Sequence, residues 1–268
     1  MKILHLCLAN FYIDNYSYQE NMLPKFHKQM GYKVEIIASL FTFDENGKGS
    51  FLEEGSTYIN EDGIRVTRLE YKNSKSSDRL RQYKGTYEAI SKSRPDIIFI
   101  HGCQFLDIKY VVKYVQEYKN VKVFVDNHAD FLNSAKNFLS KNILHKIIWR
   151  YCAHLIEPYT SKFYGVLPAR VDFLKNVYKL PKEKIDLLVM GVDDDIVEEL
   201  GQRQTSIRER YSIKKDDFLI VTGGKIDNNK LQTLLLMEAI NEIKNSKVKL
   251  LVFGSVVPEY KNKFTIST

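Results

Sequence analysis

Cysteine, proline, glycine and tryptophan are all scarce in this sequence of 268 residues, with 3, 6, 13 and 1 occurrences respectively. The cysteines, Cys7, Cys103 and Cys152, are odd in number and far apart. Their spacing excludes a closed disulfide framework and a Cys-x-x-Cys metal or redox motif. The few glycines and prolines exclude a collagen-like, mucin-like or broadly disordered chain. These absences leave a folded globular protein that suits a reducing cytosol.

Long apolar runs are absent as well, because no stretch approaches the roughly 20 residues that a membrane-spanning helix requires. The apolar run at residues 3–9 is short, is broken by His5 and lacks a small-residue cleavage site. We interpret it as a first buried strand and not as a signal peptide. We therefore expect a cytoplasmic protein, with peripheral contact at the inner face of the cell membrane as a further option.

The charge balance is mildly basic, with 40 lysines and arginines against 33 aspartates and glutamates and a formal net charge of +7. Such an excess suits phosphate-bearing ligands or an anionic membrane surface. The lysines are scattered among acids, and the sequence shows no basic arm, zinc-finger spacing or other nucleic-acid module. We therefore predict no nucleic-acid partner.

The first two thirds of the chain alternate between strand and helix patterns. Residues 2–8 and 34–38 predict strands on either side of a helix over residues 18–30, which ends at Gly31. Near-continuous apolar strands are typical of a parallel sheet buried on both faces. Residues 41–56 are polar and predict an exposed loop. Further strands are expected at 63–69, 95–100, 121–125 and 163–166, and further helices at 79–92, 110–118, 143–156 and 169–178.

A domain boundary is predicted near residue 186, where a Pro-initiated turn, a short strand and an acidic turn follow one another. We interpret the three acids at 193–195 as an interdomain turn, because consecutive acids point in different directions and do not form a metal site. A second strand–helix–strand unit follows, with two strands where a doubly wound domain has about five or six. We expect an α/β fold with Rossmann-like domains at 1–186 and 187–268, the second of them incomplete. The second unit comprises residues 217–222, 230–244 and 248–253.

The sharpest local motif follows the strand at 217–222. Gly223 and Gly224 let the backbone turn closely, and Lys225 and Lys230 flank the start of the next helix. Bare amides at a helix start favour an anion, and the lysines add positive charge, so a diphosphate would fit there. The alternative is a tight strand-to-helix turn with solvated lysines, because the spacing matches neither the dinucleotide fingerprint nor the P-loop.

His128 follows directly after a predicted buried strand, within the polar window at residues 126–130. Ligands of open α/β folds bind at the carboxyl ends of strands. A histidine there can hydrogen-bond a hydroxyl or a phosphate and can change charge near neutral pH. The alternative is a structural hydrogen-bonding role. His101 ends the preceding strand, and we interpret it as crevice lining, because the nearby Cys103 has no evident base partner.

Basic and apolar residues recur near helical spacing between residues 136 and 156. Such a helix can lie on an anionic bilayer through its apolar face. The alternative is a core helix with an ordinary solvated face, because packing on a sheet requires the same apolar stripe. The basic residues are Lys136, Lys141, His145, Lys146 and Arg150, and the apolar stripe comprises Ile143, Leu144, Ile147, Ile148 and Tyr151.

Several windows together resemble the GT4 family of retaining GT-B glycosyltransferases, especially the bacterial enzymes that build capsule, O-antigen or similar glycans. The resemblance spans nearly the whole chain. It rests on the order and spacing of the windows, since none is diagnostic alone. The windows are residues 18–23, 62–68, 126–130, 180–193, 223–230 and 252–255.

The resemblance implies two facing Rossmann-like domains, the first holding an acceptor and the second a nucleotide sugar. It gives His128 a catalytic place near the transferred sugar. It matches Lys225 and Lys230, beside Gly223 and Gly224, to the groups that hold the donor phosphates. It implies retaining sugar transfer to a glycan or lipid-linked acceptor in bacterial surface polysaccharide synthesis, with neither a metal nor a separate cofactor. The expected acceptor-side crevice comprises Asn127, Asp130, His101, Tyr18 and Asn21.

The resemblance stops within the family's second domain. The acidic-pair segment that holds the donor sugar and ribose in the family has no counterpart before Thr268. We therefore expect an incomplete donor domain and no sugar transfer by this chain alone. The alternative function is a non-catalytic acceptor- or partner-binding module derived from the same fold. A nicotinamide oxidoreductase is disfavoured, because residues 10–14 lack a Gly-x-Gly-x-x-Gly motif.

Overall fold

The computed structural model divides into two compact units, Met1–Val192 and Asp193–Thr268. Each unit is described by itself. The structure describes residues 1–45, 47–73, 80–131, 134, 138–194, 197, 206–224 and 232–254, and the statements below concern these residues.

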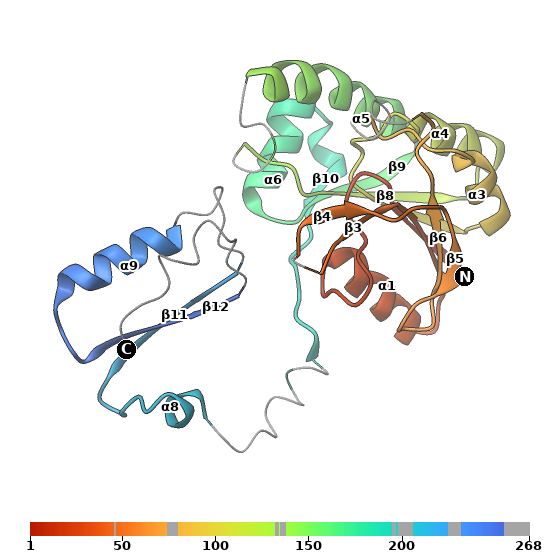
Figure 1. Ribbon diagram of the computed structural model, residues 1–268. Coiled ribbons are helices and arrows are strands. Elements are labelled where there is room, and N and C mark those ends of the chain that lie inside the picture. The colour runs from red at the N-terminus through yellow and green to blue at the C-terminus, as the bar shows by residue number, and fades with distance from the viewer. Residues whose placement is uncertain are drawn as a thin grey trace. The chain divides into compact units, whose positions relative to one another are not determined.

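The first unit is built on an eight-stranded sheet with the order β10-β9-β8-β7-β1-β2-β6-β5 (Figure 1). All neighbouring strands pair in parallel except β5, which pairs antiparallel with β6 at one edge. The strands are β1 (Lys2–Cys7), β2 (Lys33–Ser39), β5 (Thr57–Ile59), β6 (Arg65–Leu69), β7 (Ile97–His101), β8 (Lys122–Asn127), β9 (Thr160–Gly165) and β10 (Ile185–Leu187).

Helices cover both faces of this sheet. Helix α1 (Gln19–Gln29) lies on one face, whereas α3 (Thr86–Ser93), α4 (Ile108–Glu117) and α5 (Arg150–Ile156) lie on the opposite face (Figure 1). Further helical segments are η1 (Ser140–Trp149), η2 (Glu157–Tyr159), α6 (Pro168–Phe173), η3 (Leu174–Tyr178) and η4 (Lys182–Lys184). No helix in the described part of the chain is both long enough and apolar enough to cross a membrane.

Alternation along the central strands fills two cores, one on each face of the sheet. Leu4 and Leu6 of β1 point into the larger core, which also contains Cys103 and Cys152. Cys7, on the other side of β1, belongs to a smaller core on the second face. Because side chains alternate along a strand, His5 shares the face of Cys7 and lies toward α1. Burial on both faces explains why these strands are almost continuously apolar, as predicted.

Strand order reverses beside β1, which places a binding crevice at its carboxyl end. The chain passes from β1 to β2 and β6 on one side, and then returns to β7, β8, β9 and β10 on the other side. In open parallel sheets the loops diverge at such a switch point and leave a crevice between them. The loops after β1, β7 and β8 therefore open toward one place.

The region predicted as an exposed loop at 41–56 is instead partly folded into a hairpin. Strands β3 (Phe41–Phe43) and β4 (Gly49–Phe51) pair antiparallel. The ring of Phe41 stacks on Phe11 at 4.0 Å between centroids. Arg68, 2% exposed, holds the start of this hairpin by donating hydrogen bonds to the carbonyl oxygens of Ser39 and Phe41. The hairpin was missed because tertiary contacts, and not local polarity, determine it.

Two further predictions need correction. The helix predicted over 79–92 is not continuous: Leu80 is helical, but Tyr83 then forms an isolated antiparallel bridge with Tyr71, and α3 begins at Thr86. The short edge strand β5 was not predicted at all. Its three residues are too few for a recognisable alternation.

The helix predicted over 143–156 presents apolar side chains on more than one face. The turns of η1 are of the wide π type, so residues four apart share a face. His145 and Trp149 therefore share the buried face, although His145 was counted among the basic surface residues. Ile147 and Tyr151, which the core-helix alternative places in the packed stripe, are each 62% exposed. The result is a helix with apolar side chains on both its buried and its exposed face.

The second unit forms a strand–helix–strand motif, as predicted. Strands β11 (Phe218–Gly223) and β12 (Val248–Phe253) pair in parallel, and α9 (Gln232–Ile243) connects them. A short helix α8 (Ile207–Arg210) precedes them and begins with a capping box between Ser206 and Glu209.

Candidate functional site

A cavity of about 570 Å³ opens at the crevice beside β1 in the first unit. The loop after β1, the start of α1, the loops after β7 and β8, and the buried face of η1 all contribute to its wall. The lining residues are Ala9, Asn10, Phe11, Tyr18, Glu20, Arg81, Gln104, His128, Ala129, Ser134, Leu144, His145, Trp149 and Arg170. Aromatic rings and a few polar groups line one concave space, as in small-molecule sites generally.

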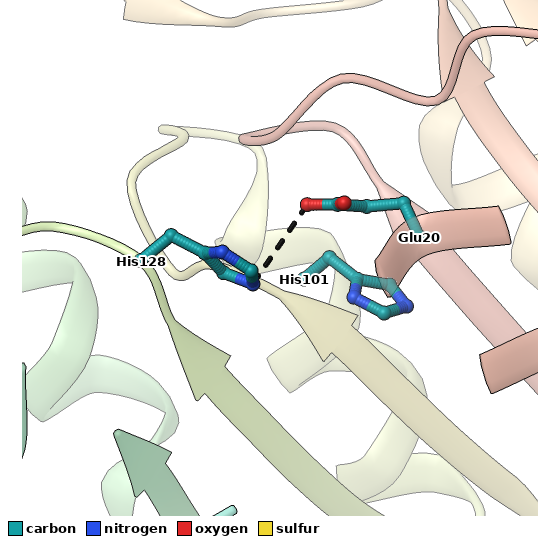
Figure 2. Close-up of side chains that lie close together, drawn as sticks. All are labelled: Glu20, His101 and His128. Atoms are coloured by element: carbon teal, nitrogen blue, oxygen red, sulfur yellow. Dashed lines mark ion pairs between the residues drawn. The ribbon is translucent and has the colours of Figure 1, made fainter. Parts of the chain in front are cut away.

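His128 lies in this cavity beside two carboxylates. Figure 2 shows the Glu20 side chain reaching from α1 toward His128, with His101 close by. His128 Nε2 lies 3.8 Å from Glu20 Oε1 and 3.5 Å from Asp126 Oδ2. Asp126 is fully buried and accepts hydrogen bonds from His101 Nδ1 at 2.8 Å and from the Gly102 amide at 3.1 Å.

These neighbours shift the pKa values of the pair in opposite directions. Burial alone would lower the pKa of His128, but the charges of Asp126 and Glu20 and a hydrogen bond to Asp126 outweigh burial and raise it. Burial alone would raise the pKa of Asp126, but His101 and His128 outweigh burial and lower it. Asp126 is therefore ionised, and His128 keeps its proton to higher pH than a free histidine. The two carboxylates therefore stabilise the protonated form of His128, which donates hydrogen bonds, at the cavity.

Three histidines form a buried chain that ends on Asp126. His27 Nδ1 lies 3.0 Å from His5 Nε2, and His5 Nδ1 lies 3.0 Å from His101 Nε2. An ionised carboxylate only accepts hydrogen bonds, so His101 must carry its proton on Nδ1. In the neutral forms of His101 and His5, His101 Nε2 accepts from His5 Nδ1–H, and His5 Nε2 accepts from His27 Nδ1–H. The carboxylate therefore fixes the direction of every hydrogen bond in the chain.

Glu20, His101 and His128 each bring one possible metal-ligand atom to within 4.8 Å of the others. However, both ring nitrogens of His101 are already engaged, one with Asp126 and the other with His5. Binding an ion through His101 would break one of these bonds. We interpret the cluster as a charge and hydrogen-bond network around His128.

A second network supports the cavity wall next to η1. The Gln104 amide donates to Asn127 Oδ1 at 3.0 Å and to the Tyr178 hydroxyl at 2.9 Å. The Tyr178 hydroxyl in turn lies 2.9 Å from His145 Nδ1. Burial and the charge of Arg81 lower the pKa of His145 to about 4. The Tyr178 hydroxyl donates a hydrogen bond to Nδ1 of the neutral His145, and this bond connects η3 to η1.

The predicted crevice residues occupy different depths. Tyr18 and His128 line the cavity itself. Asp130 lies behind the wall and pairs with Arg170 at 3.4 Å. His101, Asn127 and Asn21 are buried, at most 2% exposed, and belong to the supporting networks. Asn21, for example, donates to the Ile13 carbonyl at 2.8 Å and so holds the loop after β1.

Sequence reasoning missed Glu20, Arg81, Gln104 and Trp149 as cavity residues. Glu20 stands inside a window already singled out, at residues 18–23, so its acidic character next to a strand end was an available signal. Arg81 comes from a segment that no motif marks, and Trp149 comes from the 136–156 region, whose pattern indicates a helix and not a cavity. The packing of η1 and the Tyr71–Tyr83 bridge bring both residues to the crevice.

The predicted donor-phosphate turn is described only at its first two residues. Gly223 ends β11, and a Cβ there would lie 2.2 Å from the Phe253 ring. Gly224 has a φ of +125° and donates its amide to the Phe253 carbonyl at 3.1 Å. The left-handed backbone of Gly224 favours glycine there, whereas a side chain at residue 223 would have to displace the Phe253 ring. Lys225 and Lys230 lie outside the described residues.

No protein-family model and no curated protein matches the sequence. Solved structures do match. A glycosyltransferase from Rickettsia africae aligns with a TM-score of 0.59 and 16% identity, over 97% of this chain and 62% of that chain. A sucrose-phosphate synthase from Thermosynechococcus elongatus aligns with a TM-score of 0.54 and 10% identity, over 94% of this chain and 70% of the other. A protein assigned as a UDP-N-acetylglucosamine 2-epimerase from Listeria monocytogenes aligns with a TM-score of 0.55 and 12% identity, over 98% and 65%.

At these identities the likeness establishes the fold alone. The chain spans less than two thirds of the Rickettsia africae glycosyltransferase. The predicted fold class is confirmed: the chain has the mixed α/β fold, with a large parallel sheet, that GT-B glycosyltransferases and UDP-N-acetylglucosamine 2-epimerases share, and it covers only part of such a chain.

Proposed function

We propose that the protein takes part in the transfer of a sugar from a nucleotide-sugar donor to an acceptor bound in the cavity of the first unit. The observation that carries this proposal is the position of His128. It lies in a cavity of about 570 Å³ at the switch point of the sheet, with Asp126 and Glu20 raising its pKa. The aromatic rings of Phe11, Tyr18 and Trp149 line the same cavity and offer apolar faces to a sugar ring.

In such a transfer the acceptor hydroxyl oxygen forms a bond to the anomeric carbon, while the bond from that carbon to the donor diphosphate breaks. The hydroxyl proton passes to the departing phosphate oxygen. His128 would donate a hydrogen bond to the transferred sugar and orient it. Lys225 and Lys230, with the amides of Gly223 and Gly224, would stabilise the charge that develops on the diphosphate. No metal is needed for these roles.

The finer details rest on the resemblance to the GT4 family. They are retention of configuration, a glycan or lipid-linked acceptor, and a role in bacterial surface polysaccharide synthesis. A cytoplasmic site of action accords with them, because nucleotide sugars are made there and because the three cysteines are free.

A peripheral membrane contact through the 136–156 region is part of the proposal. Phe138 is 78% exposed, and Leu139, Ile147 and Tyr151 also present large apolar surfaces to solvent. The sequence from 131 to 156 contains no aspartate or glutamate, whereas it contains three lysines and one arginine. Exposed apolar side chains among uncompensated cations match an anionic bilayer surface. An acceptor anchored in that bilayer would be held near the cavity, because the buried face of η1 lines the cavity while its exposed face would contact the bilayer.

Titration calorimetry with UDP-, GDP- and dTDP-sugars tests the donor part. We expect one class to bind, and Lys225→Ala with Lys230→Ala to weaken it about ten-fold or more, since each charge-assisted contact contributes roughly 1.5–3 kcal/mol. Lys247→Ala is the control, because Lys247 is an exposed lysine of the same unit that pairs with Asp216. Unchanged affinity in the double variant would refute the donor site. Binding of no donor would favour the non-catalytic module, and epimerisation of UDP-N-acetylglucosamine without an acceptor would favour the other activity found on this fold.

His128→Gln tests the acceptor part in a chain that carries a complete donor domain. We expect slower sugar transfer with a nearly unchanged melting temperature, because His128 lies at the cavity surface. A large loss of stability with unchanged transfer would assign His128 a structural role.

A further inference from the structure

We infer that Arg81 forms a subsite for an oxyanion of the acceptor, a phosphate or a carboxylate, in the cavity of the first unit. The inference rests on the proposed function and names the chemical class of acceptor that this cavity takes. Nothing in the sequence motifs pointed to Arg81.

Arg81 occupies a wall common to two cavities. It lines the cavity of about 570 Å³ that contains His128, and it also lines a neighbouring cavity of about 180 Å³ beside Phe11 and Tyr83. Its Nη1 donates to the Gln104 carbonyl at 2.7 Å, and its guanidinium carbon lies 5.7 Å from the centre of the Trp149 ring. These contacts hold the guanidinium at the wall and occupy only part of its five N–H donors.

No carboxylate compensates this charge among the residues that the structure describes. The two comparable arginines of the first unit are both paired: Arg68 lies 2.8 Å from Asp14, and Arg170 lies 3.4 Å from Asp130. The titratable groups that act on Arg81 include the hydroxyls of Tyr71, Tyr83 and Tyr178, and burial raises the pKa of Tyr83 and Tyr178 well above its usual value. Burial lowers the pKa of Arg81, and Arg81 helps to keep His145 neutral.

The backbone conformation of Arg81 is a second unfavourable feature, besides the charge without a counter-ion. Arg81 has a φ of +55°, in the left-handed region that disfavours arginine. Residues in such conformations persist where the surroundings hold them, often at ligand sites. A half-buried cation without a counter-ion, on a strained backbone, is unfavourable for the ligand-free protein. An arriving oxyanion would supply the missing counter-ion, and the planar guanidinium is suited to a two-pronged contact with phosphate or carboxylate.

Calorimetry without any donor tests this subsite directly. The probes are inorganic phosphate, glucose 6-phosphate and glucuronate, with glucose as the uncharged comparison. We expect the charged probes to bind more tightly than glucose, and we expect Arg81→Gln to weaken their binding at least ten-fold. Arg81→Lys should weaken binding of the charged probes less than Arg81→Gln, because lysine keeps the positive charge. It should still bind them less tightly than arginine, because lysine lacks the planar guanidinium. The relative affinities of glucose 6-phosphate and glucuronate identify the anion.

Arg94→Gln is the matched control. Arg94 also has a left-handed backbone, with a φ of +48°, but it is exposed and does not line the cavity. Its replacement should leave binding of all probes unchanged. The melting temperature of ligand-free Arg81→Gln should equal or exceed that of the unmodified protein, because the substitution removes an uncompensated, half-buried charge.

Two results would overturn the inference. One is that the unmodified protein and Arg81→Gln bind the charged probes equally well. If Arg81→Gln also has a markedly lower melting temperature, Arg81 is a structural partner of Gln104. The other is glucose binding as tightly as glucose 6-phosphate. Neither result bears on donor binding by the second unit, which is measured with nucleotide sugars alone, so the proposed function would stand or fall separately.

Discussion

His5 Nδ1 and His101 Nε2 lie 3.0 Å apart with both rings fully buried, and this contact joins β1 to the end of β7, where His101 contacts the carboxylate of Asp126. The two histidines are diagonal neighbours on adjacent strands of the sheet. His5 of β1 pairs with Phe99 of β7, and His101 stands two residues further along the same strand. The bond extends a line of donors from His27 to Asp126, and it makes the protonation of four side chains interdependent.

The first prediction concerns the tautomers of this chain. His5, His27 and His101 should all carry their proton on Nδ1 in the neutral form. Each Nδ1–H donates to the next group in the chain, which is His5 Nε2 for His27, His101 Nε2 for His5 and the Asp126 carboxylate for His101. Long-range nitrogen–proton NMR spectra near pH 7.5 distinguish the two tautomers. An Nε2-protonated His101 would contradict the direction we derive from Asp126.

The second prediction concerns Asp126→Asn. The substitution keeps the shape of the side chain and removes the charge that raises the pKa of His128. The pKa of His128 should therefore fall, since burial, which lowers it, would then act with less opposition. An NMR titration of the His128 ring measures the change. Asp186→Asn is the control, because Asp186 is exposed and distant in sequence from this network; an equal shift in both variants would rule out a specific pair.

The third prediction concerns stability against pH. His5, His27 and His145 have pKa values below 6.5 in the folded protein, because burial disfavours their charged form. Below pH 6.5 the unfolded chain binds protons that the folded protein does not, so the free energy of unfolding should decrease as the pH falls. Each such histidine contributes a slope of up to about 1.4 kcal/mol per pH unit. His128 has the opposite shift, so its contribution is complete below 6.5 and is lost as the pH rises through its folded value.

Urea unfolding between pH 4 and pH 7.5 checks this slope. His145→Phe should make it shallower between 6.5 and about 4, the interval over which His145 remains neutral only when folded. An unchanged slope in this variant would mean that His145 titrates freely in the native protein.

The fourth prediction concerns Arg68. Its side chain donates to Tyr12, Ser39 and Phe41 carbonyls and pairs with Asp14, so it joins β6 to the loop after β1 and to the hairpin. Arg68→Met should lower the free energy of unfolding by about 2–4 kcal/mol, because several buried acceptors lose their donor. Arg65→Met, on the same strand but exposed, should change it by less than about 0.5 kcal/mol. Comparable losses in both would show that strand propensity, and not the buried network, is responsible.

The fifth prediction concerns the exposed face of η1 and α5. The combined substitution of Ile147→Ser and Tyr151→Ser should weaken binding to vesicles with anionic lipid by about ten-fold or more, because each side chain loses roughly 1–2 kcal/mol of apolar burial. Ile59→Ser is the control, since Ile59 is 63% exposed on β5. Sedimentation with vesicles that contain or lack anionic lipid measures the effect. Equal binding by all variants would exclude this face as the contact.

The fold was largely predictable from the sequence, and the site only in part. Apolar runs such as residues 95–100 predict buried parallel strands because both faces must exclude water. The position of His128 is also predictable, because His128 directly follows a predicted strand and the carboxyl ends of parallel strands lie at the same edge of the sheet. The contact between His5 and His101 depends on the register of two strands 96 positions apart, which no local pattern specifies. Arg81 reaches the cavity only through the packing of segments that lack a motif.

The buried thiols make the two layers of the first unit separately observable. Cys7 lies in the core beneath α1, whereas Cys103 and Cys152 lie in the core on the opposite face. Burial raises the pKa of all three thiols, so the folded protein offers no reactive thiolate. Alkylation of a given cysteine therefore has to wait until its own layer opens. If α1 detaches first, Cys7 is modified before the other two, and the order of labelling records which layer of the sheet loosens first.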